Sequence, residues 1–95
     1  MELGLQDKVA LITGGSKGIG LATAIALSRE GAKVAILARN AEQLEEATFQ
    51  IENLTEGEVL AIQADVTSEA DCQRAIEETV KHFGSLHILV NNAGT

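Results

Sequence analysis

The residues best suited to chemistry lie in a glycine-rich segment near the N-terminus, Thr13-Gly14-Gly15-Ser16-Lys17-Gly18-Ile19-Gly20. A continuous apolar run precedes this segment, and a helical pattern begins at Gly18. Gly14 can take a tight turn after a strand, a missing Cβ at Gly18 lets a phosphate approach the backbone, and Gly20 lets a helix pack closely. The N–H groups that open such a helix bind anions. In this strand–turn–helix context the segment predicts a pyrophosphate site, with a purely structural turn as the alternative.

The charges beside this loop distinguish between two nucleotide cofactors. An acidic residue about twenty positions after the loop binds the ribose hydroxyls and favours NAD. Here that position is Ala38, Arg39 follows it, and Lys17 stands directly before Gly18. Arg can hold a 2′-phosphate through two parallel hydrogen bonds, and no acidic residue is expected to compete for it. We therefore predict NADP (NADPH) in preference to NAD, with an ordinary solvated arginine at position 39 as the alternative.

Short apolar runs alternate with longer amphipathic segments along the whole chain. The predicted strands are residues 8–13, 32–38, 58–64 and 86–90, and the predicted helices are 18–30, 40–57 and 68–84. The connections are too long for hairpins, and right-handed crossovers make the sheet parallel. The pattern therefore predicts an α/β protein with a partial Rossmann (doubly wound) fold. We expect a four-stranded parallel sheet of order 3-2-1-4 and three helices, the first two on one face and the third on the other.

Each predicted helix has a cap and an apolar stripe. Asn40 and Ser68 are expected N-caps, and Asp71 completes a pattern that resembles a capping box. Gly31, Gly57 and Gly84 are expected to close the helices. The stripes expected to face the core are Ile19, Ala22, Ile25, Ala26 and Arg29 in the first helix, Leu44, Ala47, Ile51 and Leu54 in the second, and Cys72, Ala75, Ile76, Thr79, Val80 and Phe83 in the third.

Composition excludes several classes of protein. With 95 residues the chain is expected to form one domain, and 14 acidic against 7 basic side chains argue against binding to nucleic acid or an anionic membrane. No run approaches the ~18 apolar residues of a membrane span, and the N-terminus has no secretory pattern. A single cysteine fits a reducing compartment, so we predict a cytoplasmic protein.

The remaining polar side chains predict neither a metal site nor a catalytic group. His82 and His87 are not spaced as a helical metal pair. Cys72 lies on an apolar stripe without a basic neighbour to activate it, so a core thiol is expected. The chain contains no Tyr, and no mechanism that needs a phenolic proton donor can be carried out by these residues alone.

Three motifs together resemble one enzyme family. The loop has the spacing T-G-x-x-x-G-I-G, Asp65-Val66 follow the third predicted strand, and Asn91-Asn92-Ala93-Gly94 follow the fourth. In this order they are similar to motifs of the short-chain dehydrogenase/reductases, most of all to the 3-oxoacyl-carrier-protein reductase branch and related alcohol or sugar dehydrogenases. A different user of the Rossmann fold, such as a methyltransferase, would not be expected to have this glycine spacing with N-N-A-G.

The resemblance implies roles for particular residues. The backbone of residues 14–20 would hold the pyrophosphate, with Ser16 and Lys17 near the adenosine ribose and its phosphate. Asp65 would accept a hydrogen bond from the adenine amino group, Val66 would lie against the ring, and Asn91 would be structural. The full set of expected cofactor-binding residues is Gly14, Ser16, Lys17, Gly18, Ile19, Gly20, Arg39, Asp65, Val66, Asn92, Ala93 and Gly94.

The catalytic residues of this family, a Ser and a Tyr and Lys in Y-x-x-x-K, lie beyond N-N-A-G. We therefore expect residues 1–95 to be a single N-terminal dinucleotide-binding domain without the catalytic half, inactive by itself. The complete enzyme would be an NADP-dependent oxidoreductase that transfers hydride between NADPH and a carbonyl or alcohol. The alternative is a nucleotide-binding or self-assembling module without catalysis.

The fourth predicted strand is the basis of a prediction about association. It would lie at an edge of the sheet, and no charged side chain, Pro or bulge that would discourage pairing is expected in residues 86–92. We therefore expect a homodimer in which two fourth strands meet edge to edge.

Overall fold

The computed structural model describes residues 4–92, so Ala93 and Gly94 of the expected site lie outside the described residues. Its elements alternate between strand and helix, as predicted. In chain order they are β1 (Val9–Thr13), α1 (Gly18–Arg29), β2 (Lys33–Ala38), α2 (Ala41–Thr55), β3 (Val59–Gln63), α3 (Glu69–Phe83) and β4 (Ile88–Asn91).

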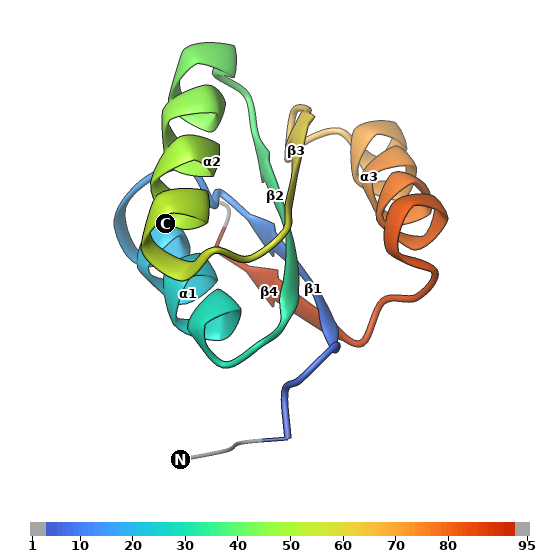
Figure 1. Ribbon diagram of the computed structural model, residues 1–95. Helices are drawn as coiled ribbons and strands as arrows, with labels where there is room; N and C mark the ends of the chain where they lie inside the picture. The colour runs from blue at the N-terminus through green and yellow to red at the C-terminus, as the bar shows by residue number, and fades with distance from the viewer. Residues whose placement is uncertain (1–3, 93–95) are drawn as a thin grey trace.

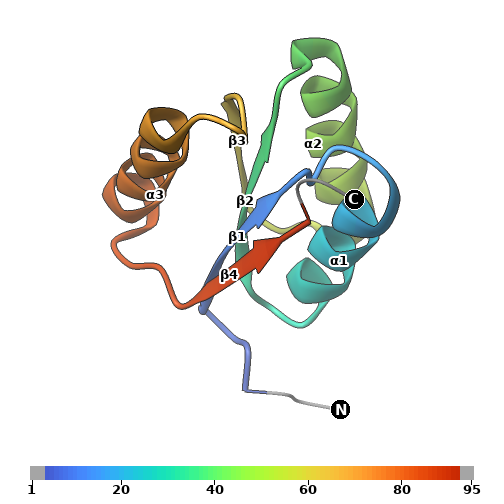
Figure 2. The ribbon, with the colours of Figure 1, turned by 180° about the vertical axis from the view of Figure 1, so that it is seen from behind.

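The strands form one parallel sheet of order β3-β2-β1-β4, which confirms the predicted topology. Val9 pairs with Lys33 at the start of β1, and Ala10 pairs with Ile88 on its other side. Helices α1 and α2 cover one face of the sheet and α3 covers the other (Figure 1). Figure 2 shows the same arrangement from behind, with β4 at one edge of the sheet.

An apolar layer lies on each face of the sheet, because the central strands bury side chains on both sides. The layer under α1 and α2 includes Ile12, Ile36 and Ile51, each fully buried. The layer under α3 is smaller and is built around Leu11 and Leu37. These two layers keep β1 and β2 rigid, and the loops that follow both strands therefore begin from fixed positions.

The predicted N-caps are confirmed. The Asn40 side chain accepts a hydrogen bond from the Gln43 N–H, and the Ser68 hydroxyl accepts one from the Asp71 N–H. The reciprocal hydrogen bond of the predicted capping box is wrong. The Asp71 carboxylate accepts from the Asp65 N–H rather than from the N–H of Ser68.

The predicted end of α2 is also wrong. Glu56, not Gly57, takes the left-handed conformation after this helix, with φ 57°. A glycine at position 57 serves close packing instead, because a Cβ added there would lie 2.2 Å from Ser28 Oγ. Gly57 is therefore suited to this position by its size. Gly84 does close α3 in a left-handed conformation, as expected.

The stripe predicted for α1 is wrong except at Ile25, which is partly buried and packs against the apolar layer. Ile19 is 78% exposed, and Ala22, Ala26 and Arg29 are exposed too. The buried residues of this helix are Gly20, Ala24 and Ser28. Small side chains at four-residue spacing let the helix axis approach the sheet and α2. Because these side chains are only weakly hydrophobic, a search for apolar periodicity does not identify this face as the buried one. In the other helices Leu54 and Val80 are more exposed than their stripes predicted.

Within residues 4–92, none of the helices is long and apolar enough to cross a membrane.

Candidate nucleotide-binding site

The expected site residues gather at one edge of the sheet, where the carboxyl ends of the strands meet. Thr13 at the end of β1 pairs with Leu37 of β2 and with Asn91 of β4. Ala38 and Gln63 pair in the same way at the ends of β2 and β3. Ligands of open parallel α/β sheets bind at this edge, near the point where the strand order reverses. That point lies between β1 and β4, directly beside the glycine loop.

The glycine loop has the backbone geometry that its sequence predicts. Gly14 turns the chain off β1 with φ +68°, and its N–H donates to the Leu37 carbonyl at 2.7 Å. A Cβ added to Gly20 would lie 2.1 Å from the Gly14 carbonyl oxygen, so only glycine lets α1 begin this close to the turn. Gly15 is equally confined, with an added Cβ 2.7 Å from the Ile36 side chain.

Gly18 differs from these glycines because it faces open space. It has φ +58°, and a Cβ added to it would meet no atom within 4 Å. It is also the first residue of α1, whose N-cap Lys17 makes no side-chain hydrogen bond to the helix. The N–H groups of this first turn are thus available to an anion that approaches over Gly18.

The other loop residues have different surroundings. Ser16 is buried, whereas the side chains of Lys17 and Ile19 are exposed. The exposed Ile19 at the start of α1 offers an apolar surface that the fold itself does not use. Lys17 adds a cation close to the N-terminus of α1.

Thr13 connects the ends of β1 and β4, a role that sequence reasoning missed. Its hydroxyl donates to Asn91 Oδ1 at 3.0 Å and accepts from the Asn92 N–H at 2.9 Å. This contact fixes the start of the N-N-A-G segment against the glycine loop. The structural role expected for Asn91 agrees with this geometry. The only signal in the sequence was the Thr that precedes the glycines.

Arg39 and Asp65 meet at the ends of β2 and β3. Arg39 Nη2 lies 3.0 Å from Asp65 Oδ2. The expectation that no acidic residue competes for Arg39 is therefore wrong. It failed because Arg39 and Asp65 are far apart in sequence, whereas the parallel pairing of β2 and β3 brings the ends of these two strands together. The two residues singled out for the adenosine end of a cofactor thus contact each other.

The Asp65 carboxylate is strongly stabilised in its ionised form. Hydrogen bonds from the Thr67 hydroxyl at 2.7 Å and from the Thr67 N–H at 2.9 Å, together with Arg39, lower the pKa of Asp65 to about 2. Hydrogen bonds to the charged form are the usual cause of such a shift. Asp65 is therefore an acceptor at neutral pH, as recognition of an adenine amino group requires.

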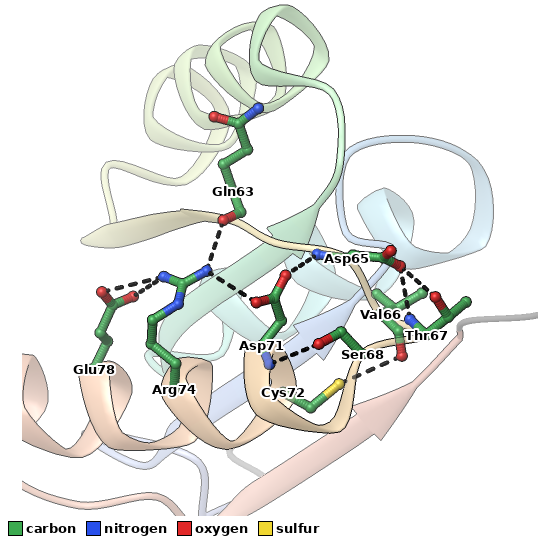
Figure 3. Close-up of polar contacts among 9 residues, drawn as sticks. All are labelled: Gln63, Asp65, Val66, Thr67, Ser68, Asp71, Cys72, Arg74 and Glu78. Carbon is green, nitrogen blue, oxygen red and sulfur yellow. Dashed lines mark hydrogen bonds and ion pairs between the residues drawn. The ribbon is translucent and has the colours of Figure 1, made fainter.

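A polar network holds the backbone of the β3–α3 turn (Figure 3). The Asp71 carboxylate accepts from the Asp65 N–H at 2.8 Å. Arg74 lies 4.0 Å from Asp71, donates to the Gln63 carbonyl at 3.1 Å and pairs with Glu78 at 3.3 Å. Sequence reasoning read Asp71 only as part of a cap and assigned no role to Arg74. Together they link the end of β3 to α3 and set the position of Asp65.

Val66 and Cys72 lie on the side of this turn that faces the core. Val66 packs against the apolar layer under α3, and its carbonyl accepts from Cys72 Sγ at 3.4 Å. Cys72 is half-buried, so the buried core thiol that was expected is confirmed only in part. Both residues line a cavity of about 420 Å³ between α3 and β4, together with Leu11, Thr13, Leu37, Thr67, Ile76, Leu89 and Asn91.

The two histidines lie on different elements and serve different contacts. His87 Nδ1 accepts from the Val9 N–H at 2.9 Å, and the His87 N–H donates to the Val9 carbonyl, so this residue joins β4 to the start of β1. His82 Nε2 lies 3.2 Å from Glu58 Oε2. Among residues 4–92, no three His, Cys, Asp or Glu side chains are placed to hold a metal ion.

Comparison with known proteins places this geometry in a family. The sequence model described as short chain dehydrogenase matches residues 8–95, nearly the whole chain. The chain belongs to the short chain dehydrogenase family. The recognition made from the glycine loop, Asp65-Val66 and the N-N-A-G segment is thereby confirmed, and an oxidoreductase family is established.

Similar proteins of the family differ in what their names describe. General stress protein 39 of Bacillus subtilis (strain 168) is 49% identical over 92 residues, which are 95% of this chain and 32% of that protein. The structure of L-sorbose reductase from Gluconobacter frateurii, complexed with NADPH and L-sorbose, matches with a TM-score of 0.94 and 40% identity over 100% of this chain and 36% of that one. An NAD⁺-bound xylitol dehydrogenase matches with a TM-score of 0.90 and 38% identity over 96% of this chain and 35% of that one.

The chain spans about a third of the length of these relatives. Both nicotinamide cofactors occur among the similar structures, so the comparisons support a nicotinamide cofactor without deciding which one. The resemblance to the 3-oxoacyl-carrier-protein reductase branch stays a prediction.

Proposed function

We propose that residues 1–95 form one domain that binds the adenosine half of NADP(H) within an oxidoreductase of the short chain dehydrogenase family. The observation that carries this proposal is the open, left-handed Gly18 at the N-terminus of α1, at the same sheet edge as Arg39 and Asp65. A pyrophosphate over Gly18 would meet the N–H groups of α1, and the adenosine would extend toward the ends of β2 and β3.

The residues fit each part of the cofactor. The space over Gly18 suits a phosphate, because a larger residue there would be strained and would fill the approach. Arg39 is a cation whose side chain is 75% exposed, and Lys17 of the glycine loop is a second exposed cation. Asp65 supplies a carboxylate acceptor for an adenine amino group. We propose that Ile19, Asn92, Ala93 and Gly94 contact the cofactor. The adenine would lie beside the backbone of Val66, whose side chain packs toward α3.

The nicotinamide ring of the bound cofactor supplies a hydride that is exchanged with a carbonyl or alcohol. We propose that this chain's residues hold and orient the cofactor and carry out no proton transfer, because the chain contains no Tyr. Binding that is equal in the ground state and the transition state does not accelerate a reaction. The 95-residue chain is therefore expected to bind NADP without reducing carbonyl compounds. The cytoplasmic location also stays a prediction.

Calorimetric titration of the chain with NADP and with NAD tests the cofactor preference. We expect tighter binding of NADP, and Arg39→Asp should remove or reverse the difference because an acid favours a free ribose. Arg29→Asp makes the same charge change at the C-terminal end of α1, away from the glycine loop. This control variant should keep the preference for NADP. Equal affinities for NADP in the wild type and Arg39→Asp would contradict the proposal.

Assembly is a second proposal, supported by the edge of the sheet. β4 is the outermost strand next to β1, and Leu89 on it is 56% exposed beside the cavity under α3. An edge strand without charges on it is a template for a second chain. We propose that the 95-residue chain forms a homodimer through antiparallel pairing of two β4 strands.

Sedimentation equilibrium tests this assembly. The wild-type chain should be a dimer, and Leu89→Lys should shift it toward the monomer because a charge on an edge strand opposes pairing. Phe49→Lys, which puts a charge at an exposed apolar position of α2, is the matched control and should remain a dimer. A monomeric wild type, or a dimer broken by Phe49→Lys instead, would overturn the proposal.

A further inference from the structure

The contact between Arg39 and Asp65 joins an exposed cation to a carboxylate that other hydrogen bonds hold in place. Asp65 is held by three groups besides Arg39: the N–H and hydroxyl of Thr67 on Oδ1, and Asp71 on its backbone N–H. The Arg39 backbone is held as well, since its carbonyl accepts from Gln63 Nε2 at 3.1 Å. The Arg39 guanidinium, however, is exposed at the end of a long side chain, and it forms an ion pair with Asp65 Oδ2.

We infer that Asp65 competes with the 2′-phosphate of the cofactor for Arg39 and thereby limits how strongly the site prefers NADP over NAD. This inference rests on the proposed function. A guanidinium grips a phosphate best when two parallel N–H groups point at its oxygens, and Nη2 now points at Asp65. Arg39 can engage a 2′-phosphate fully only by giving up part of its contact with the carboxylate.

Repulsion between the Asp65 carboxylate and the 2′-phosphate would also weaken the binding of NADP. If Arg39 bridged both groups, the 2′-phosphate and the Asp65 carboxylate would lie on opposite sides of one cation, and two anions at that separation repel each other. NAD carries no 2′-phosphate, so its binding leaves the contact between Arg39 and Asp65 undisturbed. Asp65 should therefore weaken NADP more than NAD.

The size of the effect follows from the exposure of the pair. Exposed ion pairs contribute little, and a pair of ordinary strength corresponds to about a two- to fivefold change in affinity. The effect should shrink as salt is added, because exposed charges are screened.

Two ligands that differ only in the 2′-phosphate isolate this contribution. The ratio of the Kd for adenosine 5′-phosphate to the Kd for adenosine 2′,5′-bisphosphate is measured by NMR titration of the chain. Any loss of contact with the adenine affects both ligands and cancels in the ratio. We expect Asp65→Asn to raise the ratio about two- to fivefold.

The controls separate this inference from the proposed function. Glu69→Gln removes an exposed charge from the first turn of α3 and should leave the ratio unchanged. Asp65→Ser, which keeps a hydroxyl acceptor in the turn, should raise the ratio as Asp65→Asn does and serves if that variant does not fold. Suppose that Arg39→Gln brings the ratio down to about one, but that neither Asp65 variant raises it. That result would overturn the proposed competition and leave the role of Arg39 intact. An unchanged ratio in Arg39→Gln would overturn the proposed role of Arg39 in binding NADP.

Discussion

Among the individual residues, Asp65 combines the most contacts that bear on recognition. Its carboxylate faces Thr67 and Arg39, its N–H faces Asp71, and it stands at the end of β3 where a nucleotide would lie. The sequence motif predicted an acceptor at this position, and the structure adds the groups that keep it ionised. These groups come from positions 39 and 67, and only the fold brings the first of them to Asp65.

The pKa of Asp65 gives a direct test of these contacts. Because the pKa is lower in the folded chain than the ordinary value of 3.8, ionised Asp65 stabilises the fold. That contribution is complete above about pH 4 and is lost as the pH falls through about 2. Thr67→Val should raise the pKa measured by NMR titration, because the hydroxyl is the largest cause of the shift. Thr23→Val in α1 is the control, and an equal pKa in wild type and Thr67→Val would contradict this account.

The glycines of the loop should respond differently to the same substitution. Gly20→Ala forces a Cβ onto the Gly14 carbonyl and should lower the free energy of unfolding by about 3 kcal/mol. Gly18→Ala meets no atom and should cost only about 1 kcal/mol, for its left-handed conformation, while weakening the binding of adenosine bisphosphate. Urea denaturation with a binding titration checks both variants. Equal destabilisation by the two substitutions would contradict the difference in packing between Gly20 and Gly18.

Among the secondary-structure elements, the β3–α3 turn depends on Asp71, whose contact with the Asp65 N–H the sequence did not predict. Asp71→Ala should lower the free energy of unfolding by about 1–2 kcal/mol, because it leaves the Asp65 N–H without its acceptor. Asp71→Asn keeps an acceptor oxygen and should recover part of the loss. Denaturation curves of the two variants test this, and equal losses would point to the charge rather than to the hydrogen bond.

The junction of β4 with β1 makes a similar prediction for His87. Its Nδ1 accepts from the first N–H of β1, a contact that Asp can also make. His87→Ala should cost about 1 kcal/mol, and His87→Asp should cost less. Amide hydrogen exchange at Val9 reads this contact directly and should accelerate in His87→Ala only. Faster exchange in both variants would mean that the imidazole ring itself is required.

The helices show where sequence patterns succeed and where they fail. The strands, the caps at Asn40 and Ser68, and the stripe through Leu44, Ala47 and Ile51 could be predicted, because apolar periodicity and capping chemistry are local. The buried face of α1 could not, since Gly20, Ala24 and Ser28 carry little hydrophobic signal. Their burial is set by how closely α1 approaches the turn after β1 and the end of α2, which is a property of the tertiary structure.

For the whole molecule, the order and direction of the strands followed from the sequence alone. Connections of this length and handedness leave few topologies, and the structure has the predicted one. The contact between Arg39 and Asp65 could not be foreseen by the same reasoning, because it depends on the register of β2 against β3. The sequence therefore predicted which residues form the candidate site, but it did not predict the ion pair between two of them.

The central claim is that the adenosine half of NADP binds along the carboxyl edge of the sheet, from Gly18 to Asp65. Titration of the isotope-labelled chain with adenosine 2′,5′-bisphosphate, followed by amide chemical shifts, tests it most directly. We predict shift changes concentrated at residues 14–20, at Arg39 and at residues 65–67, with α2 and the amino ends of the strands unchanged. Absence of saturable changes, or changes centred on the outer face of α2, would contradict the account.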